Sequence, residues 1–247
     1  MHRHTDSVPV LSWAASLALP LGAASAQPVV TVFEEDFESP TGINLRGDMD
    51  VTQQTVASIY GATFNQTFTV ETLAINGPQN TFSDPSGMGG NYSIGLLSDA
   101  QNDLFAFTFN VADRDFVNVF FDLSSIDLPG LGGPFTQDGV SVPELSVMLL
   151  DTPGGVFNIG SPGSFGVLGS GTATGVASPR FEFDWTSHQF FFNATGSTDG
   201  NVTLLFDLTA GGYASLDNFL IESNEVPSPA GVAAFGLAGL VASGRRR

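Results

Sequence analysis

Apolar and polar residues alternate in many short segments in the middle of this chain. In Leu104–Val111 the three phenylalanines and the final valine fall on one face of an extended strand. Phe181–Trp185 places three aromatic rings on one face and two carboxylates on the other. A period of two with one polar face is typical of antiparallel sheet. No central window of 12 or more residues shows a helical period, so the pattern predicts an all-β fold.

Turn residues separate the segments that carry this strand pattern. The predicted strands are Val29–Phe33, Val51–Ile59, Thr63–Ile75 (with a bend), Tyr92–Leu97, Leu104–Val111, Phe116–Leu123, Glu144–Leu150, Phe181–Trp185, Gln189–Ala194, Val202–Leu208 and Ser215–Ile221. The Gly-, Pro- and Ser-rich stretches Asn76–Gly90, Asp127–Pro143 and Asp151–Ser178 predict long surface loops. Residues 27–225, between two unusual ends, have the size of a single sandwich domain.

The N-terminal end, residues 1–26, has the three parts of a secretory signal peptide. Arg3 lies in a short charged region, and an apolar stretch follows from about Val8 to Ala23. Ala24-Ser25-Ala26 is a small-x-small cleavage site before Gln27. We therefore expect the chain to use the export machinery. A buried N-terminal helix is the alternative, although such a helix has no reason to end in Ala-x-Ala.

The C-terminal end, residues 226–247, combines three features in a fixed order. It begins with Val226-Pro227-Ser228-Pro229-Ala230 and continues with the apolar run Gly231–Ala242. Three arginines, Arg245, Arg246 and Arg247, complete the chain. Such a short apolar helix crosses a thin bilayer only if the arginines reach the headgroups, and they predict a cytoplasmic C-terminus.

This order of features resembles the PEP-CTERM sorting signal of Gram-negative bacteria, in which a membrane enzyme, exosortase, recognises the proline motif. Ser228 stands where that family has its central Glu. The resemblance implies a protein exported to the cell surface or extracellular matrix, and anchored transiently or stably in the inner membrane through the C-terminal helix. An ordinary C-terminal tail anchor is the alternative.

The charge and the absence of Cys exclude several classes of partner and of catalytic chemistry for the exported part. The whole chain has a net charge of −18 and no Cys. Arg3 and the three C-terminal arginines lie in the end segments, so residues 27–225 keep three Arg against 24 acidic residues, a net charge of −21. An acidic surface repels phosphate backbones, which excludes nucleic acid as a partner. Without Cys there is no disulfide, thiolate nucleophile or Cys-ligated metal. The 22 Phe predict a packed core.

The two ends of the central domain suggest a cation site. The segment Glu34–Ser39 opens the domain and Tyr213–Ile221 closes it. Together they resemble galactose-binding-like, carbohydrate-binding jelly-roll modules, in which the chain ends meet around a structural calcium. The resemblance implies a jelly-roll β-sandwich and nominates Glu38 and Asp217 as Ca²⁺ ligands, with Asp36 as a weaker candidate. Carboxylates from two distant strands suit a hard cation. Ordinary turn and strand-end roles are the alternative.

No catalytic constellation is recognisable in the sequence. His188 is the single His of residues 27–225, no Gly-x-Ser-x-Gly motif occurs, and His188 reads as a surface or edge-strand residue. Trp185 and Tyr213 are candidate platforms for a sugar ring, although Trp and Tyr are few. The sequence thus favours a non-enzymatic surface or matrix protein, with extracellular polysaccharide as a hypothetical ligand. An extracellular glycoside hydrolase or lyase is the alternative.

Overall fold

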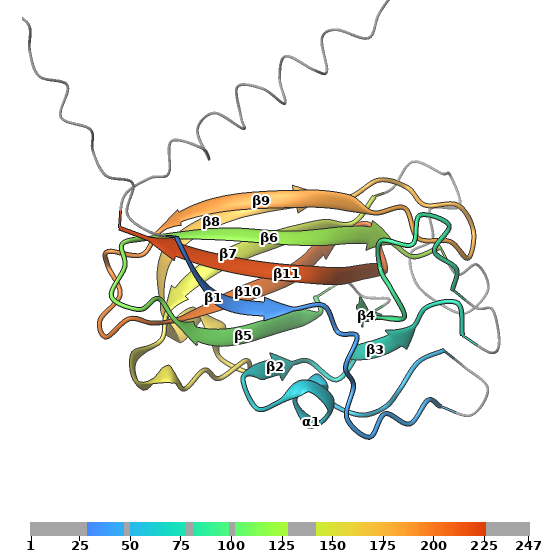
Figure 1. The fold of residues 1–247 in the computed structure, drawn as a ribbon, viewed down its shortest axis with the longest axis horizontal. Helices are drawn as coiled ribbons and strands as arrows, with labels where there is room; N and C mark the ends of the chain where they lie inside the picture. The colour runs from blue at the N-terminus through green and yellow to red at the C-terminus, as the bar shows by residue number, and fades with distance from the viewer. Residues whose placement is uncertain (1–28, 47–49, 78–81, 99–101, 128–141, 226–247) are drawn as a thin grey trace, which may run out of the picture.

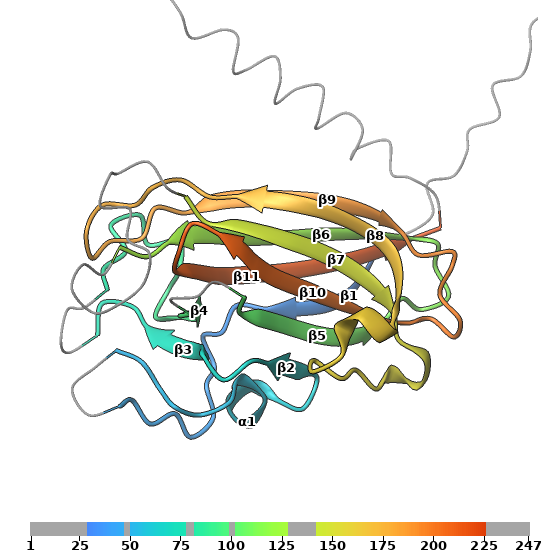
Figure 2. The same cartoon turned by 180° about the vertical axis from the view of Figure 1, so that it is seen from behind.

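A computed structural model describes residues 29–46, 50–77, 82–98, 102–127 and 142–225 as a sandwich of two antiparallel β-sheets. The order of the six-stranded sheet is β3-β4-β11-β6-β9, with β1 added beside β11, and that of the five-stranded sheet is β2-β5-β10-β7-β8 (Figures 1 and 2). All strand pairs within these sheets are antiparallel. The all-β, jelly-roll-like sandwich is therefore confirmed.

The strands of the six-stranded sheet are β1 (Val30–Glu35), β3 (Val70–Ala74), β4 (Tyr92–Leu96), β6 (Phe116–Ser125), β9 (Thr186–Asn193) and β11 (Ala214–Asn224). Those of the five-stranded sheet are β2 (Phe64–Gln66), β5 (Leu104–Asn110), β7 (Glu144–Asp151), β8 (Gly166–Thr174) and β10 (Asn201–Ala210). One α-helix, α1 (Val56–Tyr60), and two 3₁₀ turns, η1 (Pro153–Gly155) and η2 (Pro162–Ser164), complete the described elements.

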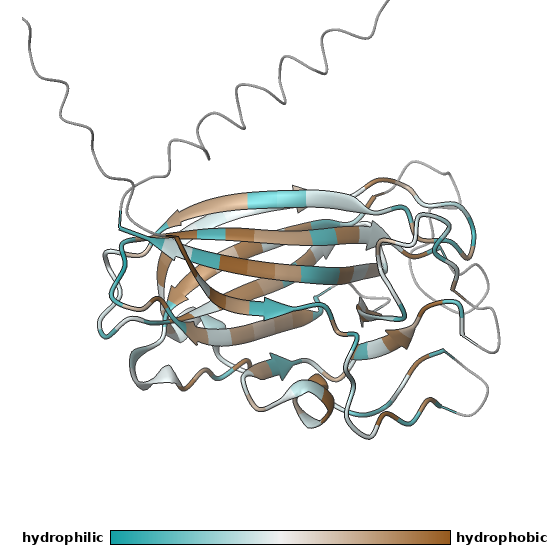
Figure 3. Cartoon of the chain, in the orientation of Figure 1, coloured by the Kyte–Doolittle hydropathy of each residue, from teal (hydrophilic) through white to brown (hydrophobic). Residues whose placement is uncertain are grey.

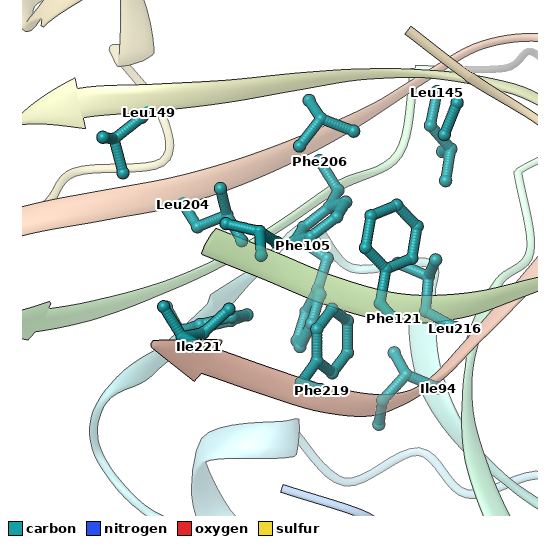
Figure 4. Packing of buried hydrophobic residues seen from close by; sticks show 14 of the residues in the cluster. Ile94, Phe105, Phe121, Leu145, Leu149, Leu204, Phe206, Leu216, Phe219 and Ile221 are labelled. Atoms are coloured by element: carbon teal, nitrogen blue, oxygen red, sulfur yellow. The ribbon is translucent and has the colours of Figure 1, made fainter. Parts of the chain in front are cut away.

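Phenylalanine rings from both sheets fill the space between them. Phe105 and Phe206 of the five-stranded sheet meet Phe121 and Phe219 of the six-stranded sheet, as Figure 4 shows, and all four are at most 1% exposed. Phe121 and Phe206 lie edge to face with ring centroids 5.0 Å apart. Burying such a ring stabilises the fold by roughly 1.5–3 kcal/mol. Figure 3 shows the hydrophobic colour concentrated in the strands, as the alternating pattern predicts.

Three strand predictions are wrong. In Val51–Ile59 the chain makes only short bridges before α1, because Thr55 caps a helix by accepting a hydrogen bond from the Ser58 N–H while Val56 and Ile59 are buried one turn apart. Thr63–Ile75 is two strands in different sheets, β2 and β3. Phe181–Trp185 is not a strand, although Phe183 and Trp185 are buried beneath the neighbouring loops.

One strand, β8, lies in a stretch that we expected to be a loop. Its sequence is rich in Gly because side chains of β9, in the other sheet, occupy the space beside it. A Cβ at Gly169 or Gly171 would overlap the rings of Phe192 and Phe190, which point inward from β9. Glycine therefore makes room for two large side chains where the edges of the two sheets approach each other.

A bulge in β11 restores the inward orientation of its second half. Asp217 pairs with Asp122 and Leu220 pairs with Phe120, so two β11 residues, Asn218 and Phe219, lie opposite one residue of β6. Asn218 adopts a left-handed conformation with φ of 52°. Because side chains alternate between faces, one extra residue turns Phe219 toward the core while Asp217 stays on the outer face.

The pairing of β1 with β11 brings the two ends of the described domain together, since Val30 lies opposite Ser223 (Figure 1). The proposed signal cleavage residues and the proposed sorting motif lie outside the described residues. Within the described ranges, no helix combines the length and the apolar character needed to cross a membrane.

The outer faces of the two sheets differ in how they are covered. Residues 152–165 fold across the outer face of the five-stranded sheet, where Phe157 packs with Ala106, Leu150 and Leu205. These four residues form a small core of their own, separate from the one between the sheets. The segment with η1 and η2 therefore covers part of that face.

Candidate functional site

Asp217 is the most perturbed ionisable group in the described chain. Its side chain is 1% exposed on the outer face of β11, and burial raises its pKa to about 9 against the hydrogen bond from the Asn218 N–H. The charges of Glu38, Asp122 and Asp36 raise it further. Oδ1 accepts the Asn218 N–H at 2.7 Å, whereas Oδ2 is buried with no hydrogen-bond partner among the described residues. A buried carboxylate oxygen without a donor is costly.

Glu38 comes from the segment after β1 and reaches the chain just before β4. Its Oε1 accepts the N–H groups of Asn91 at 2.6 Å and Tyr92 at 3.1 Å, and its Oε2 accepts the side-chain amide of Asn91 at 2.6 Å. A Cβ at Gly90 would overlap this carboxylate. The Glu38 carboxylate is therefore held in place, close enough to Asp217 for their charges to interact.

One further residue of the site, Asp122, could not be found from the sequence motif. Asp122 lies directly opposite Asp217 on β6, and its oxygens accept the Ser187 hydroxyl at 2.6 Å and the Asn218 amide at 2.9 Å. The same Asn218 amide donates to the Met88 carbonyl at 2.9 Å. Sheet register alone brings Asp122 here, because 95 residues separate it from Asp217 in the sequence.

Asp36 has a different position from Glu38. Its side chain is exposed, and Oδ1 accepts the Glu38 N–H at 3.1 Å, which shapes the turn that carries Glu38. The charges of Glu38 and Asp36 both act on the pKa of Asp217, so the three sequence-nominated residues lie in one region of the fold.

The chemistry of this cluster fits a hard cation. The Oδ2 of Asp217 has no hydrogen-bond partner among the described residues, and the charges of Glu38, Asp122 and Asp36 raise the pKa of this carboxyl, so a bound cation would lower the cost of its ionised form. In the described ranges, no group of three or more His, Asp or Glu side chains is arranged to hold a metal ion. A cation at this place stays a prediction from the sequence.

The aromatic residues nominated as sugar platforms are placed differently from the expectation. Trp185 is 9% exposed, stacks on Phe183 at 5.0 Å, and leaves no room for a Cβ at Gly89. The indole is therefore used in packing and is not an open platform. Tyr213 is half-buried against the same cluster.

His188 lies on the edge strand β9, as expected, but its ring points toward the core. It stacks on Phe121 with centroids 5.4 Å apart, and burial lowers its pKa while Asp122 opposes that shift. Ser187 points to the opposite face, where it donates to Asp122. The neighbouring Ser and His therefore cannot act as a nucleophile and its base.

A shallow hollow of about 330 Å³ lies at one end of the five-stranded sheet. Its lining contains no charged side chain, and its polar groups come from Thr63, Asn65, Thr108, Asn110 and Asn201. Asn110 donates its amide to Asn201 at 3.1 Å. Neutral amides and hydroxyls of this kind can exchange hydrogen bonds with a polyhydroxylated ligand.

No protein-family model matches the chain, and no curated protein matches it. Among solved structures, it is similar to the K1 cleaved adhesin domain of Lys-gingipain from Porphyromonas gingivalis W83, with 12% identity over 79% of this chain and 99% of that one, at a TM-score of 0.46. It is also similar to the CBM22-1 xylan-binding domain of Paenibacillus barcinonensis Xyn10C, with 12% identity over 83% and 100% and a TM-score of 0.45. At these values neither likeness assigns a ligand or an activity to this chain.

Proposed function

We propose that this chain is an exported, non-catalytic surface or matrix protein whose β-sandwich binds polysaccharide and is stabilised by calcium. The observation that carries the proposal is the buried Asp217 carboxylate, whose Oδ2 has no hydrogen-bond partner among the described residues. It lies next to Glu38, which is fixed by the chain before β4. A cation bound there would join the first strand segment to the last strand.

Polysaccharide is the ligand class that fits the neutral hydrogen-bonding groups of the surface. The hollow between β2, β5 and β10 offers amides and hydroxyls without a charged group. Sugar hydroxyls are both donors and acceptors, and they match such a lining.

Export rests on the two ends of the sequence. The signal peptide of residues 1–26 would direct the chain across the inner membrane, with cleavage after Ala26. The segment 226–247 would hold it there through the apolar helix until an exosortase-like enzyme acts at Val226–Ala230. Mass spectrometry of the protein from a host with and without that enzyme would identify the processed ends. An unprocessed C-terminus in both hosts would contradict sorting.

Binding and calcium dependence are tested together. The full-length chain is applied to a glycan array in calcium and in EGTA, and its melting temperature is measured in both. We expect binding to at least one neutral glycan and a lower melting temperature in EGTA. An array without binding would contradict the ligand, an unchanged melting temperature would contradict the cation, and release of reducing ends would point to a hydrolase instead.

A further inference from the structure

Strands β8 and β9 have open outer sides, and both lie along the same long side of the sandwich. Strand β9 ends the six-stranded sheet and β8 ends the five-stranded sheet, and no other described strand pairs with their outer sides. Figures 1 and 2 show the two strands together along this side. The open side of a strand presents a row of unpaired N–H and C=O groups, which is a template for a further strand.

The strands on the opposite long side are covered or charged. The Thr52 N–H donates to the Thr72 carbonyl of β3 at 3.2 Å, so a neighbouring segment covers β3. Helix α1 packs beside the three-residue strand β2. Strand β1 carries Glu34 and Glu35 and has an irregular register with β11. Charges and irregular pairing are features that discourage the addition of a strand.

The pairing inside each sheet determines which backbone groups face the open sides. The Gly175 N–H donates to the Pro143 carbonyl at 2.9 Å, and hydrogen-bonded pairs alternate along an antiparallel ladder, so every second residue of β8 bonds to β7. The residues between them direct their N–H and C=O groups away from β7. The Ala194 N–H donates to the Asp115 carbonyl at 2.6 Å and sets the same alternation for β9. The outward-directed residues include Ser170, Thr172 and Thr174 of β8, and Ser187, Gln189 and Phe191 of β9.

The two sets of outward-directed groups lie level with each other across the sandwich. The Phe190 ring occupies the place of a Cβ at Gly171, and the next inward pair along the strands repeats this contact. These contacts also show that β8 and β9 run in opposite directions. The neighbouring residues Thr172 and Gln189 therefore lie level with each other, one in each sheet.

We propose that β8 and β9 form the interface of a symmetric dimer with a second copy of this chain. A two-fold axis perpendicular to the sheets, through Thr172 and Gln189, would pair β8 with the β8 of the copy and β9 with its β9, both antiparallel. Each sheet would continue across the axis, and the outward N–H and C=O groups of both strands would find partners. A strand of another protein could pair with one open side, whereas a second copy satisfies both at once. This inference goes beyond the proposed function and depends on neither polysaccharide nor calcium.

Charge and apolar surface favour a second copy at this place. Residues 27–225 carry a net charge of −21, yet residues 152–179, which include β8, contain no charged residue, and neither does β9 apart from His188. Val167 on β8 is 60% exposed, and Val176 just beyond its end is 41% exposed. Antiparallel pairing about Thr172 brings Val176 of one copy near Val167 of the other, which removes apolar area from water.

The first test is disulfide cross-linking through one introduced cysteine, which is specific because the chain has no Cys. On the proposed axis Thr172 lies opposite itself in a hydrogen-bonded pair, where the Cα atoms are about 5.5 Å apart. That separation suits a disulfide. Thr172→Cys in the full-length chain, in mild detergent, should therefore form a covalent dimer on oxidation with copper phenanthroline.

Thr174→Cys is the matched control for the position of the axis. Thr174 is also an exposed, outward-directed residue of β8. It lies two residues from the axis, so its Cα atoms in the two copies would be more than about 13 Å apart. That separation is too long for a disulfide, and we expect no covalent dimer from this variant.

The second test is sedimentation equilibrium of the full-length chain in density-matched detergent at low and high NaCl. The wild type should dimerise more tightly at high salt, because salt screens the repulsion between two acidic copies. Gln189→Glu places two carboxylates opposite each other on the axis, and it should weaken dimerisation about fivefold at low salt and less at high salt. The control Gln53→Glu makes the same change at an exposed residue before α1 and should leave dimerisation unaltered.

Three results would overturn the inference. A wild type that is monomeric at both salt concentrations would remove the dimer. The absence of a covalent dimer from Thr172→Cys, or an equal yield from Thr174→Cys, would place the contact elsewhere. Dimerisation that Gln189→Glu and Gln53→Glu weaken equally would assign the association to another surface of the chain.

Discussion

The substitution Asp217→Asn gives the sharpest test of the cation site. Asparagine has nearly the shape of aspartate and keeps an oxygen that accepts the Asn218 N–H. It replaces the unpartnered Oδ2 with an amide that can donate toward Glu38 and Asp122, whose charges act on this position. The change therefore replaces a buried titratable group with a neutral one of the same shape and leaves the packing intact.

The size of the effect follows from the pKa. Burial raises the pKa of Asp217 from an ordinary value near 3.8 to about 9, so between these pH values the folded state keeps a proton that the unfolded state has lost. The free energy of unfolding then falls as pH rises through this window, and it is highest at the acid side. At 1.36 kcal/mol per pH unit, the cost at pH 7 without a cation is on the order of 4 kcal/mol.

The assay is urea unfolding of the wild-type and variant chains at pH 5, 6, 7 and 8, in EGTA and in calcium. In EGTA the wild type should lose stability as pH rises, and Asp217→Asn should be more stable than the wild type at pH 8, with a flatter dependence. In calcium the wild type should recover, because a ligand that binds only the folded state stabilises it. The variant should respond little to calcium.

Asp199→Asn serves as a matched control. Asp199 is an exposed carboxylate whose pKa is lowered by the N–H groups of Gly154 and Asn201, so its charge favours folding at neutral pH. Its substitution should lower stability and leave the calcium response unchanged. The reasoning about Asp217 is refuted if Asp217→Asn is less stable than the wild type in EGTA at pH 8 and keeps the same pH dependence.

Three further substitutions test the frame around the site. Glu38→Gln should lower stability by about 1–2 kcal/mol in urea unfolding and weaken the calcium response, because its new amide would face the Asn91 amide; an unaltered calcium response would count against Glu38 as a ligand. Asn218→Ala should lower the free energy of unfolding by about 2–3 kcal/mol, because it removes two hydrogen bonds and puts alanine in a left-handed conformation. Asn218→Gly removes the same hydrogen bonds but tolerates that conformation, so it should cost less. Equal losses in urea unfolding would mean that the backbone conformation is not strained. Phe219→Ala should lower the free energy of unfolding by about 3–5 kcal/mol, because it removes a ring buried in the core. The melting temperature should fall in calcium and in EGTA alike. A fall in EGTA alone would mean that the bulge, which turns Phe219 inward, acts only on the cation site.

The alternation of apolar and polar residues alone determined which side chains are buried. The inward residues of Leu104–Val111 are all in the core, and even Phe183 and Trp185 are buried although no strand forms there. The apolar character of a side chain is fixed by its residue type. It therefore favours burial whether or not the backbone around it forms a strand. The local pattern predicted the wrong secondary structure at α1 and β8. At α1 the Thr55 cap favours a helix, and at β8 the glycines make room for Phe190 and Phe192.

The motif at each end of the domain nominated Glu38 and Asp217 as ligands of one cation, which stays a prediction, and the charge of Glu38 does act on the pKa of Asp217 in the structure. Only the tertiary structure decided the electrostatics of that place. The pairing of β11 with β6 sets Asp122 against Asp217, and the bulge at Asn218 turns its amide toward both Asp122 and the Met88 carbonyl. The register of β6 and β9 likewise decides which of their side chains lie opposite one another. Register and desolvation depend on strands far apart in the sequence, so they are absent from any local pattern.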